Sequence, residues 1–380
     1  MKTCKYILFC LFLLYLAPAK AVEEPEDDGK YVTISGIVKD KSDKKALSYA
    51  SVSIAGSVEA TVTNADGEFT FKVKEPVSET ALEVSHLGYA NARIHLKEGD
   101  TELHTVWLTP DTQMLGEVVV SGHNPRELVA EAVIDLHKTP YTQDAGRDRV
   151  RILKGRRLLS PKASDTLAVK LLGGPTAAIY LDVVKNPDLL LSPEVLPLYD
   201  FHLEEPATID ERPQYVVSFM PNRKLPYAIY YGRFYIDKER LSFTRAEFNL
   251  DVSDRYKATQ AILRSKPFGL RFKPEEVAYQ VNYTDHNGKT YLSYVRNEIR
   301  FKCDWRRRLF STNYAVVSEM VVTDIEPSTT NIPIREAFGK DQILSDDASL
   351  FFDKDFWGNY NIIQPEESLE KAVSRLRKMY

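Results

Sequence analysis

Residues 34–73, ISGIVKDKSDKKALSYASVSIAGSVEATVTNADGEFTFKV, decide the fold of the first part of the chain. At their end, Phe69 and Phe71 alternate with polar residues, as in a strand with one buried face. The preceding stretch 64–67 (NADG) predicts a turn, because Asn and Asp side chains bond their own backbone and Gly accepts positive φ. Short strands separated by such turns predict a β-sandwich over residues 31–110.

The same region carries a family resemblance. Its marks follow one another along the chain: Gly36-Ile37-Val38, Ala50-Ser51-Val52, Thr63 to Phe69 and Gly88-Tyr89. With these marks the region resembles the carboxypeptidase-regulatory-like domain, and the resemblance implies a seven-stranded, transthyretin-like sandwich. Asn64 and Asp66 could also be read as calcium ligands, but a calcium site needs more oxygen ligands than this turn offers. A plain turn is therefore the interpretation.

The first residues have the organisation of an export signal. Lys2 and Lys5 precede an apolar run at 7–16, and Ala19-Lys20-Ala21 offers small residues where a signal peptidase reads the chain. The apolar run is too short for a membrane-spanning helix, which needs roughly 20 residues. We therefore expect cleavage after Ala21, an exported mature chain and a flexible acidic tail at 22–30.

Composition limits the partners and the bonds of the mature chain. The net charge of -4 over 380 residues gives no electrostatic case for nucleic acid. Cys4 and Cys10 lie within the expected signal, so Cys303 remains alone and no internal disulfide is expected. We interpret Cys303 as a buried structural thiol. No segment after the signal has the length and apolarity of a transmembrane helix.

A linker and a helix are expected at 111–140. The stretch 109–122, TPDTQMLGEVVVSG, resembles the segment that follows the same domain in TonB-dependent outer-membrane receptors. The roughly 260 residues after it cannot hold a plug and a barrel of some 22 strands with about ten residues each. The receptor architecture is therefore not expected, whereas an envelope location remains. Residues 124–138 predict a helix, with Asn124 as its cap and apolar residues at helical spacing.

Residues 141–380 predict a larger antiparallel β domain, either a curved sheet or a half-barrel, with a few packing helices. Asn287-Gly288 between two alternating stretches is the strongest hairpin signal in the chain. The return strand after it alternates apolar and charged residues, which predicts one buried and one charged face. At the end of the chain, residues 365–378 predict a helix that closes the sheet, with carboxylates in its first turn and cations in its last.

Two stretches in this region carry a second resemblance. Residues 228–250 (AIYYGRFYIDKERLSFTRAEFNL) and 351–378 (FFDKDFWGNYNIIQPEESLEKAVSRLRK) resemble a group of Bacteroidetes envelope proteins. These proteins join the regulatory-like domain to a second β-rich domain. The resemblance implies an architecture and an envelope location, and it implies no activity.

The family name invites a search for a zinc carboxypeptidase site, which needs an HxxE pair and a later His. The chain has two such strings, His95-Leu96-Lys97-Glu98 and His202-Leu203-Glu204-Glu205, and His286 as a later His. The first string lies at a strand end inside the sandwich, the second runs into Pro206, and His286 falls in the predicted hairpin turn. Zinc needs three converging ligands, which these positions do not offer, so no metal site is expected. No cofactor and no catalytic residue are expected either. The sequence also has no G-x-S-x-G elbow, no phosphate-binding Gly-rich loop, no C-x-x-C and no H-E-x-x-H motif.

The remaining candidates are binding surfaces. Aromatic residues crowd one hairpin arm, but neighbours in a strand point to opposite sides, so most of them are expected to pack in the core. They are Tyr227, Tyr230, Tyr231, Phe234 and Tyr235. Arg306-Arg307-Arg308 could touch anionic lipid or glycan, and a solvated turn between strands is the alternative.

The sequence thus favours a non-enzymatic protein of the periplasm or outer membrane. We expect its larger β domain to bind an envelope protein, lipid or glycan that the sequence does not identify. The alternative is an envelope hydrolase, metallo- or carboxylate-dependent, whose site assembles from dispersed carboxylates or from His202 and His286. A convergent polar cluster in a cleft would favour the hydrolase, and an apolar concavity or flat patch would favour the binding protein.

Overall fold

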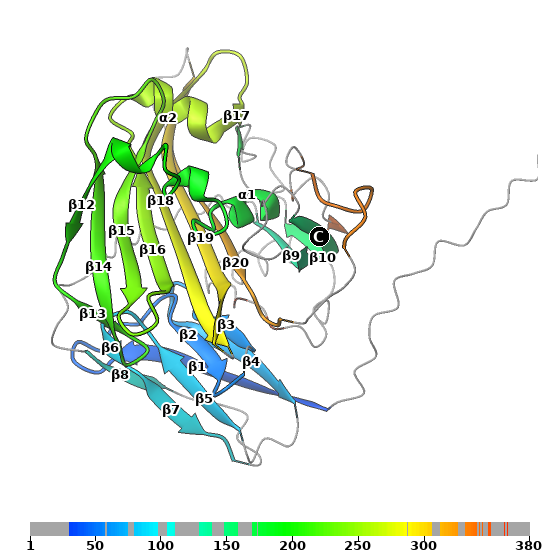
Figure 1. Ribbon diagram of the computed structural model, residues 1–380. Coiled ribbons are helices and arrows are strands. Elements are labelled where there is room, and N and C mark those ends of the chain that lie inside the picture. Colours follow the sequence, from blue (N-terminus) through cyan, green and yellow to red (C-terminus); the bar gives the residue numbers. More distant parts are fainter. Residues whose placement is uncertain are drawn as a thin grey trace, which may run out of the picture. The chain divides into compact units, whose positions relative to one another are not determined.

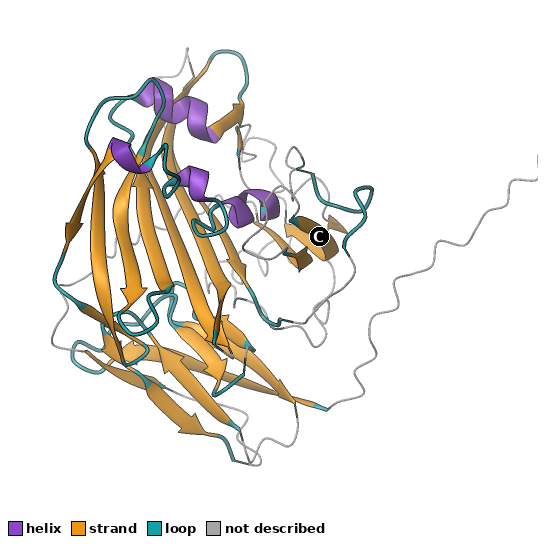
Figure 2. Cartoon of the chain, viewed as in Figure 1, coloured by secondary structure: helices purple, strands orange, loops and turns teal. Residues whose placement is uncertain are grey.

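The fold is mainly β, as predicted (Figures 1 and 2). The computed structural model describes residues 30–57, 59–74, 80–97, 105–110, 129–138, 148–158, 169–172, 174–286, 288–305, 312–325, 331–339, 342, 344, 349–350, 361 and 363. The described residues from Tyr31 onward belong to one compact unit.

A β-sandwich opens the described chain. One of its sheets has the order β4-β1-β8-β6 and the other β3-β2-β5-β7. The strands are β1 (Tyr31–Asp40), β2 (Ser51–Ile54), β3 (Ala60–Val62), β4 (Glu68–Lys74), β5 (Ala81–Ser85), β6 (Tyr89–Ala90), β7 (Ala92–His95) and β8 (Val106–Pro110). A single residue, Asn91, separates β6 from β7, so one stretch of chain crosses between the sheets. Counted as one strand, it gives the seven strands that were predicted.

The turn before β4 has the geometry that its sequence predicts. Asn64 Oδ1 accepts the backbone N–H groups of Asp66 and Glu68 at 3.0 and 2.8 Å. Gly67 has φ 76°, and a Cβ atom there would lie 2.8 Å from the carbonyl oxygen of Val38. Glycine alone fits this position, because any side chain would strain the turn and strike β1. The turn delivers Phe69 into the sandwich core, where it is fully buried.

The prediction of a helix at 124–138 is wrong, because residues Val129–His137 within it form strand β9. Strand β9 pairs in antiparallel register with β10 (Arg149–Leu158). Ile134 and Leu136 are two residues apart, hence on one face of the strand, and both pack against the main apolar core. The conformation therefore depends on the partner strand and on the core, and the spacing of apolar residues along the local sequence gives no information about either.

An open antiparallel sheet forms the larger β domain. Its order is β12-β14-β15-β16-β18-β19-β20, and β13 also pairs with β14. The strands are β12 (Tyr199–Leu203), β13 (Ala207–Ile209), β14 (Arg212–Pro221), β15 (Tyr230–Asp237), β16 (Phe243–Leu250), β18 (Leu270–His286), β19 (Lys289–Trp305) and β20 (Thr312–Val321). Within the described residues β12, followed by the short β13, forms one edge of this sheet, and β20 forms the other.

The predicted hairpin at Asn287-Gly288 is confirmed by strands β18 and β19. His286 and Lys289 are paired across the turn, and Gly288 has φ 73°. On β19 the predicted alternation is also confirmed: Ile299, Phe301 and Cys303 are buried, while Arg296, Glu298 and Arg300 form ion pairs on the other face.

Short elements cover the apolar face of the large sheet. They are α1 (Pro175–Tyr180), two 3-10 turns (Pro187–Leu189 and Leu196–Leu198), α2 (Arg255–Ile262), and the paired strands β11 (Lys170–Leu171) and β17 (Leu263–Ser265). Strand β21 (Ser349–Leu350) pairs in parallel with β10. The main core lies between the sheet and α1, β9 and β10, and a second core lies under α2. Among the described helices, none has both the length and the apolarity that a membrane span requires.

Several predicted segments lie outside the described residues. They are the signal at 1–21 with its cleavage site at Ala21, the tail at 22–29, the linker at 111–128, Arg306-Arg307-Arg308 and the helix at 365–378.

The loop between β5 and β6 joins the sandwich to the large sheet. Leu87 packs against a small apolar cluster formed by Ala207, Val216 and Tyr235. Its neighbour His86 is partly buried, close to the charge of Arg245 on β16. From the sheet, the Arg296 guanidinium lies over the ring of Tyr49 at 4.0 Å, a cation–π contact.

This burial makes the stability of the protein depend on pH. Desolvation and the nearby Arg245 lower the pKa of His86 from 6.5 to about 4, while Glu247 opposes the shift. The unfolded chain therefore binds a proton to His86 at a higher pH than the folded chain does. The free energy of unfolding should fall as pH decreases from about 6.5 to about 4, by about 2–3 kcal/mol from this group.

Urea unfolding near neutral pH and near pH 4.5 measures this fall. In His86→Gln the fall should be smaller than in the native chain by about 2 kcal/mol. The exposed His95 at the end of β7 supplies the control, since His95→Gln should behave like the native chain. Equal falls in the native and His86→Gln chains would contradict the assignment.

Candidate functional site

Strand β12 is an exposed apolar edge of the large sheet. Phe201 and Leu203 on this strand are 38% and 70% exposed. They lie opposite Phe219 and Val217 of β14, so they face the side of the sheet that carries the main core. An edge strand that is neither covered nor interrupted offers its backbone to another chain. We define the β12 edge as residues Tyr199–Leu203.

The hydrogen-bond pattern places the amides of Phe201 and Leu203 on the outer side of this strand. The N–H group of Glu204, directly after β12, donates to the carbonyl of Val216 on β14 at 2.8 Å. Glu204 and Val216 are therefore a hydrogen-bonded pair of the two strands. Hydrogen-bonded and non-bonded pairs alternate along antiparallel strands. Positions 203 and 201 therefore direct their N–H and C=O groups away from β14.

A row of aromatic rings supports the β12 edge from the core. Phe219 stacks on Phe234 with ring centroids 4.5 Å apart, and Tyr199 meets Phe219 edge-on at 5.6 Å. The ring of Phe201 continues the row, 6.3 Å from Phe219. The exposed side chains at the edge thus rest on a packed, buried layer, which holds them in place before any partner arrives.

The charged residues of the β12 edge and of the turn after it are all acidic. Asp200, Glu204 and Glu205 are exposed, and the stretch 199–205 (YDFHLEE) has no Lys or Arg. Ser218 Oγ donates to Glu204 Oε1 at 2.6 Å and fixes that carboxylate beside the strand. The surface therefore combines apolar side chains, outward amides and negative charge.

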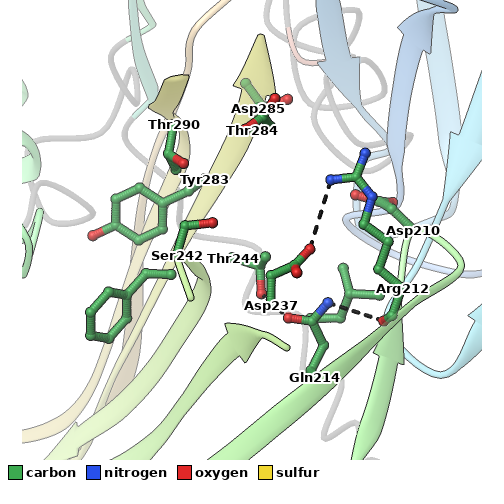
Figure 3. Close-up of a pocket in the computed structure, with 12 residues that line it drawn as sticks. Asp210, Arg212, Gln214, Asp237, Ser242, Thr244, Tyr283, Thr284, Asp285 and Thr290 are labelled. Atoms are coloured by element: carbon green, nitrogen blue, oxygen red, sulfur yellow. Dashed lines mark hydrogen bonds and ion pairs between the residues drawn. The ribbon is translucent and has the colours of Figure 1, made fainter. Parts of the chain in front are cut away.

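A small polar concavity, drawn in Figure 3, lies near the hairpin of β13 and β14. Asp237 Oδ1 accepts the N–H groups of Glu239 and Arg240 at 2.8 and 2.9 Å. Its Oδ2 points toward Arg212, 3.7 Å away, and is not hydrogen-bonded to any described residue. The volume, about 30 Å³, is that of one water molecule. The geometry is that of a supported turn between β15 and β16.

A second concavity adjoins a buried ionic network. Asp182 accepts hydrogen bonds from Lys138 Nζ at 2.5 Å and from the Tyr283 hydroxyl at 2.9 Å. The buried Lys185 Nζ lies 3.8 Å from Asp148, which lines an open concavity of about 190 Å³. Pockets for small-molecule ligands usually span about 300–1,000 Å³. Both described concavities are smaller than this range.

The histidines of the two HxxE strings lie apart. His202 is exposed on β12, opposite Ser218, whereas His95 ends β7 in the sandwich. Glu205 is exposed in the turn after β12. Glu98 and the side chain of His286 lie outside what the structure describes. In the described part of the chain, no group of three His, Cys, Asp or Glu is placed to hold a metal.

The aromatic arm of β15 divides between the two faces of the sheet, as alternation predicts. Phe234 enters the main core, and its neighbour Tyr235 packs on the opposite face with Leu87. Cys303 is buried in the core under α2, and burial raises the pKa of its thiol to about 11. It is a protonated structural thiol at neutral pH.

The residues that the sequence analysis missed are Phe201 and Leu203. Leu203 stands inside the HxxE string that directed attention to His202. The apolar–polar alternation of 199–203 (YDFHL) is a strand signal, but its position at the edge depends on strand pairing that no local pattern reports.

Comparison with known proteins supports the first part of the sequence analysis. Residues 34–120 match the family model described as CarboxypepD_reg-like domain, which confirms the resemblance of this region. No curated protein matches the chain. A solved protein of unknown function from Bacteroides fragilis NCTC 9343, described as membrane-associated, is 12% identical over 77% of this chain and 95% of its own. Its TM-score of 0.18 is too low to indicate a shared fold.

Proposed function

We propose that this chain is a non-enzymatic protein of the cell envelope that binds another protein through the β12 edge. The partner contributes an extended segment, which adds a strand beside β12 and alternates apolar with basic residues. The domain organisation follows the sequence analysis, with a signal at 1–21, a sandwich at 31–110, a linker and a β-rich domain. Export to the periplasm or outer membrane is part of the proposal and rests on the signal.

The observation that carries the proposal is the combination of features at Phe201 and Leu203. Their side chains are exposed and apolar, their amides point outward, and buried rings support them. Strand addition uses these features together, since the backbone supplies affinity and alternate side chains supply specificity. The carboxylates of Asp200, Glu204 and Glu205 favour a basic segment by charge complementarity.

The hydrolase alternative has weaker support in the described geometry. A hydrolase site needs a cleft in which acid, base and substrate converge. The concavity around Asp237 has the volume of about one water, and its carboxylate is used to fix a turn. Asp182 and Lys185 are buried in contacts that tie α1, β9 and β18 together.

Photo-cross-linking in the native envelope tests the binding proposal. A photo-reactive amino acid at position 203 should give one discrete protein adduct, and the same probe at the exposed Val317 on the opposite edge strand should not. Phe201→Pro should reduce the adduct about tenfold, because proline removes an outward N–H without removing a bond to β14. Fractionation of the same cells should place a mature chain beginning at Val22 in the envelope.

Phe201→Ala is the matched control, because it removes the ring and keeps the N–H. It should retain most of the adduct if the backbone carries the binding. Equal cross-linking at 203 and 317, or equal effects of Pro and Ala at 201, would overturn strand addition. Recovery of the chain from the cytosol with Met1 intact would overturn export.

A further inference from the structure

One end of the large sheet carries a basic, aromatic surface, which meets the start of the β12 edge where Asn222 Nδ2 donates to Asp200 Oδ1 at 3.4 Å. We define the basic tip as α2, β17 and the loop 266–269, together with the loop 222–227 between β14 and β15. Figure 1 shows α2 and β17 at the same end of the sheet. Lys257 Nζ donates to the carbonyl of Leu225 at 2.7 Å, which ties α2 to the second loop.

The most exposed large apolar side chain of the described residues lies in this tip. Phe268 is 97% exposed, and Tyr256 on α2 is 72% exposed. The loop that carries Phe268 is a formed turn: Lys266 Nζ donates to the carbonyl of Leu270 at 2.5 Å, and Gly269 has φ 84°. The ring is thus held outward by a built turn, without packing on the protein's own core.

Basic residues are frequent in the sequence on both sides of this ring. The segment 252–273 has six basic residues, Arg255, Lys257, Arg264, Lys266, Arg271 and Lys273, and a single acidic one, Asp254. Two of the six are paired with carboxylates, Lys257 with Asp254 and Lys273 with Asp304. Asp254 caps α2 by accepting the N–H groups of Tyr256 and Lys257. The loop 222–227 adds Arg223 and Lys224, both exposed. This excess contrasts with the net charge of -4 for the whole chain.

We propose that the basic tip attaches the protein peripherally to an anionic lipid bilayer. Exposed aromatic rings enter the boundary between headgroups and acyl chains, and surrounding Lys and Arg pair with anionic headgroups. A ring without neighbours gains burial in such a boundary. The helix α2 itself stays on the protein, because Ala258 and Ile262 are buried in the core beneath it. The contact is therefore a surface attachment by loop and side chains.

Vesicle co-sedimentation of the mature chain tests this attachment. The chain should bind phosphatidylcholine vesicles that contain a quarter of phosphatidylglycerol, and binding should weaken at high salt and without the anionic lipid. Phe268→Ser should raise the dissociation constant about tenfold or more. Lys266→Gln with Arg271→Gln should raise it by roughly a factor of 25, on the order of fivefold for each charge.

Matched controls lie elsewhere on the surface. Ile334 and Arg335 are exposed on another loop, and Ile334→Ser or Arg335→Gln should leave vesicle binding unchanged. The proposal is overturned if the native chain does not bind anionic vesicles or if Phe268→Ser binds them as well as the native chain does. It is also overturned if Ile334→Ser weakens vesicle binding as much as Phe268→Ser does. Binding of the tip to an envelope protein in place of vesicles would also overturn it. Phe201→Pro should leave vesicle binding unchanged, so this inference and the β12 proposal can fail separately.

Discussion

Replacing Asp182 by alanine should lower the free energy of unfolding by about 3–5 kcal/mol. The Asp182 side chain is fully buried, and it receives hydrogen bonds from Lys138, Tyr283 and the backbone N–H of Lys185. Removing the carboxylate leaves the Lys138 ammonium and the Tyr283 hydroxyl without this acceptor in a place that water reaches poorly. The same change also separates three parts of the chain, because these partners lie directly after β9, on β18 and in the segment after α1.

Urea denaturation followed by tryptophan fluorescence measures this loss. Asp188 is exposed in the nearby 3-10 turn, so Asp188→Ala should change the free energy of unfolding by less than about 0.5 kcal/mol. Asp182→Asn should retain part of the hydrogen bonding and fall between the two. If Asp182→Ala lowered the free energy of unfolding no more than Asp188→Ala, the hydrogen bonds of Asp182 would not be what holds the segments after β9 and α1 against β18.

Replacing Phe219 by alanine should cost about 3–5 kcal/mol of stability and weaken the β12 edge as well. Phe219 is 1% exposed, stacked on Phe234 and in edge contact with Tyr199. Its loss leaves a cavity under Phe201, the residue whose ring and amide form part of the proposed binding surface. We therefore expect both a lower unfolding free energy and a lower cross-linking yield at position 203.

Tyr215 supplies the control on the same strand and the same face. It is partly exposed, so Tyr215→Ala should cost less than about 1 kcal/mol. Phe219→Leu, which fills much of the space, should recover a large part of the stability. If Phe219→Ala were no more destabilising than Tyr215→Ala, the aromatic row would not support the edge.

The sandwich and the long hairpin could be predicted from sequence because local signals determine them. Gly67 must take positive φ, Asn64 bonds the turn, and Phe69 alternates with polar neighbours. At the hairpin, Asn287-Gly288 fixes which residues face one another. In these places the turn chemistry and the apolar pattern agree, so a short window of sequence is sufficient.

The helix at 124–138 shows where local reasoning is insufficient. Its apolar residues fit a helical face, yet Ile134 and Leu136 also share one face of a strand, and the chain uses the second arrangement. The choice depends on β10 and on a core built from residues far along the chain. For the same reason the network around Asp182 could not be predicted, because Tyr283 lies 101 residues from it.

The candidate sites show the same division. The charge of the basic tip can be read from the sequence, but the exposure of Phe268 depends on a turn that directs it away from the core under α2. The apolar character of Phe201 and Leu203 is equally plain, yet the sequence cannot reveal that β12 is an edge. Both surfaces became candidates through exposure, which tertiary structure alone determines.

Amide hydrogen exchange of the β12 segment tests the central claim most directly. The mature chain is compared alone and in complex with the protein that cross-links to position 203. Strand addition predicts slower exchange at the outward amides of Phe201 and Leu203, with exchange in β20, the opposite edge, unchanged. Unchanged exchange at 201 and 203, with protection instead in β20 or in the sandwich, would contradict the account.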